Sequence, residues 1–214
     1  MDLCFGGCVL LAGLFLSVSA LTPEECHPLI APLSLANNSR IYGEFKTLAG
    51  SVDHEVLNKI LKVTHSSWIR FSESESNPNE VVMFEANKMN GKCYESRIKM
   101  TIDGNVARMR LTNWTSEFQL LSSADGCLAI LGNNTVSHIE PFLRLLNISK
   151  TFDDDKEFHA RGFYLMCKEV TLTEADLEHF KKQAGCLGFS RELNFRYDEA
   201  NELCTEGGGA HLDF

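Results

Sequence analysis

The chain has 214 residues and a formal net charge of −9, from 20 basic and 29 acidic side chains. This acidic balance, with no cluster of Lys or Arg to offset it, argues against nucleic-acid binding and against strong attraction to anionic membranes. The length suits one domain with a real core, or at most two small ones.

The N-terminus predicts a secretory signal peptide over residues 1–20. Cys8 to Val18 is almost wholly apolar, and Val18-Ser19-Ala20 offers a small-residue cleavage site, although no Lys or Arg precedes the apolar run. A retained anchor helix is the alternative, but the run is short for a membrane span. No later segment approaches the roughly 18 apolar residues of a span. We therefore expect a secreted, extracellular protein without a transmembrane segment.

Cysteines and glycosylation sequons fit the same compartment. An even number of cysteines in a secreted chain indicates disulfides, although number alone leaves the pairing open. A zinc site lacks the usual ligand spacing. Six cysteines follow residue 20, namely Cys26, Cys93, Cys127, Cys167, Cys186 and Cys204. Four Asn-x-Ser/Thr sequons predict glycosylation at Asn37, Asn113, Asn133 and Asn147.

The middle of the chain is typical of an antiparallel β-meander. Short apolar or alternating runs are separated by turn residues, with hairpin dipeptides at Asn90-Gly91 and Asp103-Gly104. Eight such strands should close into a barrel or stack as a sandwich. The expected strands are Ile41–Ala49, Val63–Phe71, Val81–Ala86, Tyr94–Ile102, Val106–Leu111, Phe118–Leu121, Cys127–Leu131 and Phe163–Cys167.

Two segments predict helices. Asp53–Leu61 places its apolar residues on one helical face, and a second helix should begin after an N-cap at Thr173 and end near Gly185. His138–Leu146 fits either a helix or a loop, with Pro141 placed near a first helical turn. We expect one domain over 21–204, followed by a flexible tail over 205–214.

At this point the ordered motifs resemble the lipocalins. They are Ile41-Tyr42-Gly43-Glu44-Phe45, Cys93-Tyr94, Asp103-Gly104-Asn105-Val106-Ala107-Arg108, a helix ending in Gly185-Cys186-Leu187-Gly188-Phe189, and Phe195-x-Tyr197-Asp198 before Leu203-Cys204. The match is to the α1-acid glycoprotein and apolipoprotein M branch, and is nearest to the fish saxitoxin- and tetrodotoxin-binding proteins. The resemblance implies an eight-stranded antiparallel up-and-down lipocalin β-barrel, all-β with flanking helices, plus a C-terminal α-helix.

The resemblance also implies the disulfide pairing. The family's bridges map onto Cys26–Cys186 and Cys93–Cys204, which leaves Cys127 and Cys167 for a third. Antiparallel strands around the connection 133–160 would permit this third bridge. One position departs from the family, because Phe45 stands where its Gly-x-Trp hallmark has Trp. An aromatic ring at this position still closes one end of the barrel.

A barrel of this size holds one small ligand, with alternate strand residues facing the lumen. We predict that the ligand-binding residues are Phe84, Ile98, Met100, Arg108, Phe118 and Leu120. A shift of one residue in register would exchange the two faces. The resemblance places Arg108 in the pocket as a partner for an anionic head group, whereas an Arg on a strand more often lies on the outer face. Thr47, Met89 and Met166 replace polar family positions, which implies a different ligand preference.

The predicted function is a secreted, non-catalytic carrier of a small hydrophobic or amphipathic ligand, which could be lipid-like, a toxin or drug-like. No cofactor or metal site is expected, and lipoprotein particles are a further candidate partner. One alternative is a secreted protein-interaction or immune-modulating module with a filled barrel. Another is an isomerase-like enzyme, which needs a free thiol. Guanidinium toxins would need lumen carboxylates, for which Glu85 and Glu95 are candidates.

Overall fold

The computed structural model describes residues 21–35, 38–149 and 156–212. The predicted signal peptide and the sequon at Asn37 lie outside these residues. The helices are α1 (Pro23–Ile30), the 3₁₀ helix η1 (Asn38–Ile41), α2 (Glu55–Val63), α3 (Glu140–Leu145) and α4 (Glu174–Cys186). The strands are β1 (Gly43–Val52), β2 (Thr64–Glu73), β3 (Glu80–Met89), β4 (Lys92–Asp103), β5 (Val106–Arg110), β6 (Trp114–Leu121), β7 (Cys127–Val136), β8 (Phe158–Cys167), β9 (Phe195–Arg196) and β10 (Ala210–His211).

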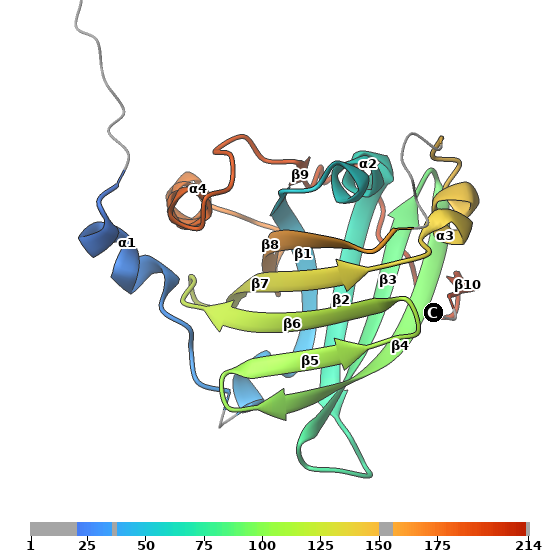
Figure 1. Ribbon diagram of the computed structural model, residues 1–214, viewed down its shortest axis with the longest axis horizontal. Helices are drawn as coiled ribbons and strands as arrows, with labels where there is room; N and C mark the ends of the chain where they lie inside the picture. Colours follow the sequence, from blue (N-terminus) through green and yellow to red (C-terminus); the bar gives the residue numbers. More distant parts are fainter. Residues whose placement is uncertain (1–20, 36–37, 150–155, 213–214) are drawn as a thin grey trace, which may run out of the picture.

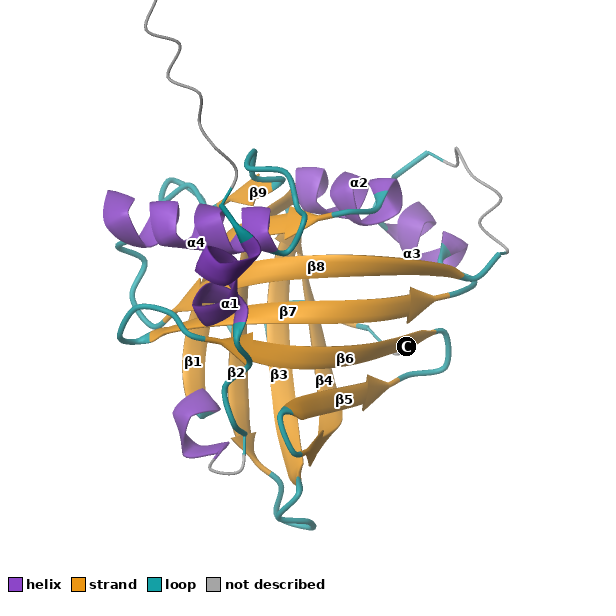
Figure 2. Cartoon of the chain, turned by 60° about the vertical axis from the view of Figure 1, so that its left-hand side comes forward, coloured by secondary structure: helices purple, strands orange, loops and turns teal. Residues whose placement is uncertain are grey.

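The first eight strands form a closed antiparallel barrel. Hydrogen-bonded neighbours follow the order β4-β3-β2-β1-β8-β7-β6-β5, and β5 pairs back onto β4. β8 returns beside β1, with Gly50 opposite Tyr164, so the path of paired strands closes on itself. Figure 1 shows the resulting curved wall, and Figure 2 shows β5 to β8 crossing in front of β1 to β4. The predicted eight-stranded up-and-down barrel is confirmed.

The predicted hairpins form at residues that adopt positive φ angles. Asn90 and Gly91 join β3 to β4 with φ values of 48° and 74°, the left-handed pair that a two-residue turn between twisted strands requires. Gly104 adopts φ 62° between β4 and β5. Several strands are longer than their apolar runs predicted. β6 begins at Trp114 and β8 at Phe158, because pairing with β7 extends the ladder through polar residues.

Capping residues mark where α1 and α4 begin. The Thr173 hydroxyl oxygen accepts a hydrogen bond from the Asp176 backbone N–H at 3.2 Å, as expected at the start of α4. Residues 140–145 are helical, with Pro141 in the first turn, which decides the ambiguity of that segment. The sequence analysis missed α1. Its signal was present, because Thr22 and Glu25 form a capping box around Pro23.

α4 packs against the outside of the barrel and shields an outward apolar face. The rings of Phe163 on β8 and Phe180 on α4 stack with centroids 4.5 Å apart. Gln183, fully buried, donates from Nε2 to the backbone oxygens of Leu29 and Ser122, each at 2.8 Å. The helix therefore joins the N-terminal segment to the β6–β7 connection.

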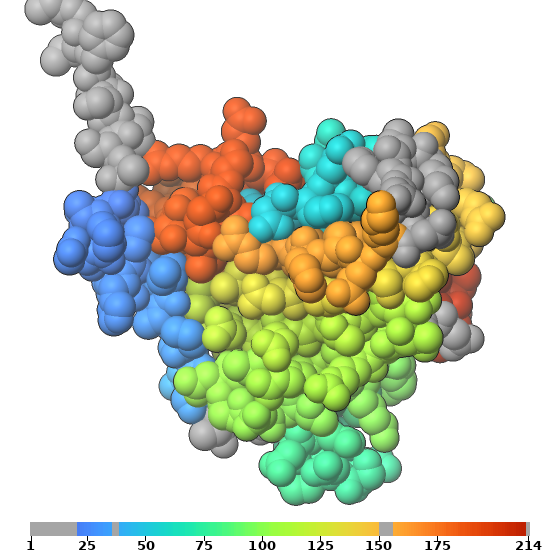
Figure 3. Space-filling model, in the orientation of Figure 1, coloured from blue at the N-terminus to red at the C-terminus, as the bar shows by residue number. Residues whose placement is uncertain are grey.

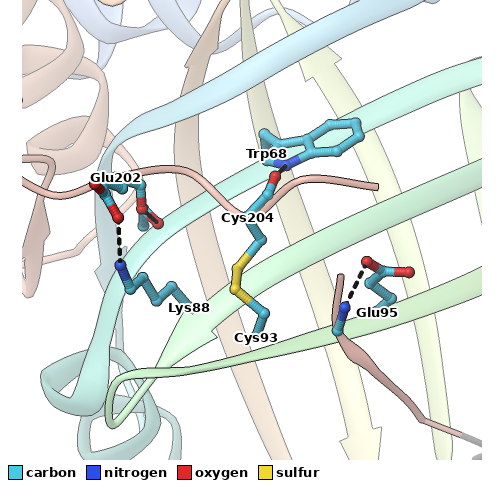
Figure 4. Close-up of a disulfide and its surroundings, with 8 residues drawn as sticks. Trp68, Lys88, Cys93, Glu95, Glu202 and Cys204 are labelled. Carbon is cyan, nitrogen blue, oxygen red and sulfur yellow. Dashed lines mark hydrogen bonds and ion pairs between the residues drawn. A yellow bond between two sulfur atoms is a disulfide. The ribbon is translucent and has the colours of Figure 1, made fainter. Parts of the chain in front are cut away.

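Three disulfides tie this barrel to its termini, in the pairing that the resemblance implied. Cys26–Cys186 joins α1 to the end of α4, Cys93–Cys204 joins β4 to the C-terminal segment, and Cys127–Cys167 joins β7 to β8. Figure 4 shows Trp68 beside the second bridge, where its indole N–H donates to the Cys204 carbonyl oxygen at 2.7 Å. The C-terminal segment is thus fixed to the outer wall at one buried point.

The C-terminal residues differ from the flexible tail that the sequence predicted. Beyond Cys204 the chain continues along β4, where β10 pairs in parallel with Ala210 opposite Tyr94 and His211 opposite Glu95. The Gly-rich composition of 207–209 suggested disorder, but Gly209 allows the chain to approach the β4 backbone closely. A Cβ atom at Gly209 would lie 3.0 Å from the Cys93 carbonyl oxygen.

The Cys93–Cys204 bridge should be a major stabilising element. It closes a segment of 111 residues, so paired Cys→Ala substitutions should lower the free energy of unfolding in urea by about 3–5 kcal/mol. Trp68→Phe, which removes one hydrogen bond to the same carbonyl, is the control and should cost about 1–2 kcal/mol. Equal losses for the two variants would show that docking of the segment, and not the cross-link, provides the stability.

Candidate ligand-binding cavity

The barrel encloses a cavity of about 260 Å³ that is lined mainly by apolar side chains. Every strand from β1 to β8 contributes to it, because alternate residues of each strand point inward. α2, α3 and the C-terminal segment complete the wall. The apolar strand residues in the lining are Ile69, Phe71, Met83, Met89, Ile98, Met100, Ala107, Met109, Trp114, Phe118, Leu120, Ile130 and Met166.

Four of the six predicted ligand-binding residues line this cavity. Ile98 and Met100 lie on the inward face of β4, and Phe118 and Leu120 lie on that of β6. Thr47, Met89 and Met166, which replace polar positions of the related family, also belong to the lining. The thioether side chains of Met89 and Met166 make this wall apolar and adaptable in shape.

The prediction that Arg108 faces the pocket is wrong. Ala107 and Met109 occupy the inward positions of β5, so the intervening Arg108 points to the outer face. There its guanidinium donates to Asp103 Oδ2 at 2.7 Å and to Glu117 Oε1 at 2.8 Å. These two carboxylates pair with the guanidinium charge that was expected to bind an anionic head group of the ligand.

The prediction for Phe84 is also wrong. On β3 the inward residues are Met83, Glu85 and Asn87, whereas Phe84 lies opposite Arg70 and Arg97 on the outer face. The two guanidinium groups lie 5.3 and 5.6 Å from the Phe84 ring centroid. Phe84 therefore belongs to an outer cluster with Trp68 and Cys204 beneath the C-terminal segment.

One end of the barrel is closed by apolar packing. Phe45 is 1% exposed and packs with Phe71 at 6.4 Å between ring centroids, while Leu35 and Ile41 of the N-terminal segment cover the same core. The Lys168 ammonium lies 5.7 Å from the Phe45 ring centroid. Phe45 thus supplies the buried aromatic face that was expected where the related family has Trp.

Helices cover the opposite end. α2 lies in the β1–β2 connection and α3 in the β7–β8 connection, and both connections fall at the same end of an up-and-down barrel (Figure 2). Leu57, Ile60 and Leu61 of α2 and Phe142 of α3 line the cavity. The Asn90 backbone N–H donates to the Val63 carbonyl oxygen at 2.8 Å, and its side-chain amide donates to the Leu146 carbonyl oxygen. The β3–β4 hairpin therefore fastens both helices.

A small polar network lies at one side of the lumen. Asn134 Oδ1 accepts from the Ser116 hydroxyl at 2.6 Å and from the Trp114 indole N–H at 3.0 Å, and Asn134 Nδ2 donates to the Ala160 carbonyl oxygen at 3.1 Å. These groups satisfy one another within the wall. They orient the Trp114 indole toward the cavity, where it can report ligand binding.

The lumen also contains a buried carboxyl group at Glu85. Its Oε1 accepts from the Ser96 hydroxyl at 3.0 Å. Burial raises the pKa of this carboxyl, and the hydrogen bonds from Ser96 and Asn87 oppose that shift. Burial likewise raises the pKa of Tyr164, which is raised further by the charge of Glu85. The cavity therefore offers one carboxyl group in a mainly apolar wall.

Glu95, the second candidate carboxylate for a toxin, does not share this lumen. It follows Tyr94 on β4, opposite Ala86, and its Oε1 accepts from the Gly209 backbone N–H at 3.0 Å. Its carboxylate thus holds the C-terminal segment on the outer wall (Figure 4). A guanidinium group in the cavity would meet Glu85 without Glu95.

Asn113, Asn133 and Asn147, at which the sequons predict glycosylation, are exposed. Within the described residues, no cluster of His, Cys, Asp or Glu is arranged to hold a metal ion. None of the helices in the described part of the chain is long and apolar enough to cross a membrane. All six cysteines from Cys26 onward are in disulfides, so the described chain has no thiol for isomerase chemistry.

The buried acid should make stability depend on pH. A raised pKa in the folded state means that ionised Glu85 destabilises the fold, so its cost is absent below the unfolded pKa and develops as pH rises through the folded pKa. Glu85→Gln should remove this cost. In urea unfolding, its advantage over the parent should be near zero at pH 4 and reach about 1–3 kcal/mol at alkaline pH. An advantage that is the same at both pH values would contradict the assignment.

Solved structures with the same architecture are lipocalins. The siderocalin Ex-FABP matches with a TM-score of 0.54 at 13% identity, covering 75% of this chain and 96% of its own. Lipocalin 12 from rat epididymis gives 0.56 at 10%, covering 81% and 91%, and a dog lipocalin allergen gives 0.50 at 17%, covering 71% and 89%. No protein-family model and no curated protein matches the sequence. At these identities the likeness establishes the architecture alone: the chain has the lipocalin fold.

Proposed function

We propose that this protein is a secreted carrier that holds a small hydrophobic or amphipathic molecule in its barrel and performs no catalysis on it. The observation that carries the proposal is the mainly apolar cavity of about 260 Å³ inside the barrel. Carrier sites are concave, largely apolar and supplied with a few polar groups. The alternative, an interaction module with a filled barrel, requires side chains where this cavity lies.

The ligand we propose has an apolar body and one polar group. The body would contact the Met and Phe side chains of the lumen, and the polar group would hydrogen-bond to Glu85 or Tyr164. Burial raises the pKa of both groups and so favours the neutral forms, which can donate a hydrogen bond. Lipid-like and drug-like molecules meet this description. A guanidinium toxin would require Glu85 to ionise, and it is the less favoured ligand.

Three disulfides and exposed sequons support secretion, since both belong to the oxidising secretory route. Membership of the α1-acid glycoprotein and apolipoprotein M branch is part of the same proposal and depends on the sequence motifs. Lipoprotein association stays a prediction, for which the described surface offers one strongly exposed large apolar side chain. This side chain is Leu145, which is 46% exposed.

Binding can be tested with neighbouring substitutions on one strand. Ala107→Phe adds a ring inside the cavity, whereas Arg108→Phe adds the same ring outside it. In a Trp68→Phe background, energy transfer from Trp114 to cis-parinaric acid, a fluorescent fatty acid, would report binding. Ala107→Phe should raise the Kd by at least about tenfold, and Arg108→Phe should change it less than about twofold.

Circular dichroism would check that both variants fold, and Met109→Phe offers a second inward substitution. Equal affinities for the inward and outward variants, or no binding by the parent, would contradict a lumen site. Organic extraction of the natively secreted protein, followed by mass spectrometry, would identify the bound molecule. A sample that carries nothing and binds no fatty acid would favour the interaction module.

A further inference from the structure

The barrel wall has a seam between β4 and β5. β4 runs from Lys92 to Asp103, but β5 pairs with it only from Met100 onward. The first part of β4 therefore keeps an edge that β5 does not reach, on the side away from β3. β10 occupies this edge, as its place in the strand order next to β4 shows.

The C-terminal segment also forms part of the cavity wall. Leu212 lines the cavity and packs with Met89, Tyr94 and Leu146. Its backbone N–H donates to the Glu95 carbonyl oxygen at 2.7 Å, which holds the side chain at the seam. In Figure 3 the C-terminal residues lie at the edge of the barrel directly below α3. Leu212, at the far end of residues 205–212, thus lies between the lumen and solvent.

A disulfide and an ion pair hold one end of this segment, and backbone hydrogen bonds to β4 hold the other. Cys204 is cross-linked to Cys93, and Glu206 pairs with Arg70 at 2.6 Å. Beyond Glu206 come three glycines, with φ of 78° at Gly207, and then short backbone pairing with β4. A glycine-rich segment between a fixed anchor and a few hydrogen bonds can act as a hinge.

The helices over the end of the barrel are held more strongly. α2 buries Val56 and Leu57, and Asp53 before it forms an ion pair with Arg161 at 2.7 Å. α3 is held by buried Leu143 and Leu146, which are 4% and 0% exposed. β10, by contrast, has both of its residues exposed. The two residues of β10 therefore add no buried side chain to the attachment of the C-terminal segment.

We propose that residues 205–212 are a hinged gate over a side entrance between β4 and β5, and that Leu212 on this gate is part of the ligand-binding wall. The gate rests on the proposed carrier function, because it controls access to that same cavity. A ligand enters when the segment beyond Glu206 leaves β4. The disulfide to Cys93 keeps the segment attached, so it can close again over the bound molecule.

Stopped-flow measurement of cis-parinaric acid binding tests the gate. A chain ending at Gly207 keeps all three disulfides and Glu206 but lacks β10 and Leu212. Its association and dissociation rate constants should both rise by at least about tenfold. Gly209→Ala should raise both rates by a smaller factor in the full-length chain, because its Cβ would lie 2.9 Å from Glu95 Cγ and 3.0 Å from the Cys93 backbone. Lys99→Ala, an exposed change elsewhere on β4, is the control and should leave both rates unchanged.

Amide hydrogen exchange in the unliganded protein gives a second readout that needs no ligand. The Leu212 amide should exchange at least about tenfold faster than the Leu146 amide of the α3 region. Equal exchange, or binding rates that neither variant changes, would overturn the gate and leave the carrier function standing. A parent protein that binds no fatty acid would overturn both.

Discussion

Closure of the antiparallel ladder is the constraint on which the rest of the structure depends. Once β5 pairs back onto β4, each strand has one face in the lumen and one face outside, and no strand can shift its register alone. This is why adjacent residues have unrelated roles. Ala107 lines the cavity, while Arg108 forms ion pairs on the surface. The same closure leaves a hollow interior, because the inward side chains, which are mainly Met, Phe, Ile and Leu, do not fill it.

The outer wall of β2 to β4 serves as a docking surface for the end of the chain. Trp68 and Phe84 bury their rings there, Arg70 and Arg97 lie over them, and the C-terminal segment crosses on top. The apolar residues of this wall therefore stabilise a connection between distant parts of the sequence. The cavity gains one of its walls from this arrangement, since the segment that crosses the outer face continues to Leu212 at the seam.

The alternation of polar and apolar residues along a strand predicts its inward face only where the other face is polar. The hairpin at Asn90-Gly91 and the cap at Thr173 depend on local chemistry, and both were predicted. The cysteine pairs came from the ordered motifs of the resemblance. The inward face of β3 could not be predicted, because Val81, Val82, Met83 and Phe84 are all apolar. One face of that strand lines the apolar lumen, and the other packs beneath the C-terminal segment. Hydrophobicity therefore does not distinguish the two faces.

Glu85 shows that a cavity with a mainly apolar lining can still offer a ligand one polar group. A carboxyl group among Met and Phe side chains costs stability when it ionises, and the Ser96 hydroxyl offsets only part of that cost. An apolar residue of similar size would stabilise the barrel better but would offer a ligand nothing except surface. A neutral acid can instead donate a hydrogen bond to the ligand, and the low dielectric of the barrel interior strengthens such a bond. For a ligand to reach this acid from the side of the barrel, we propose that residues 205–212 leave the seam beside β4.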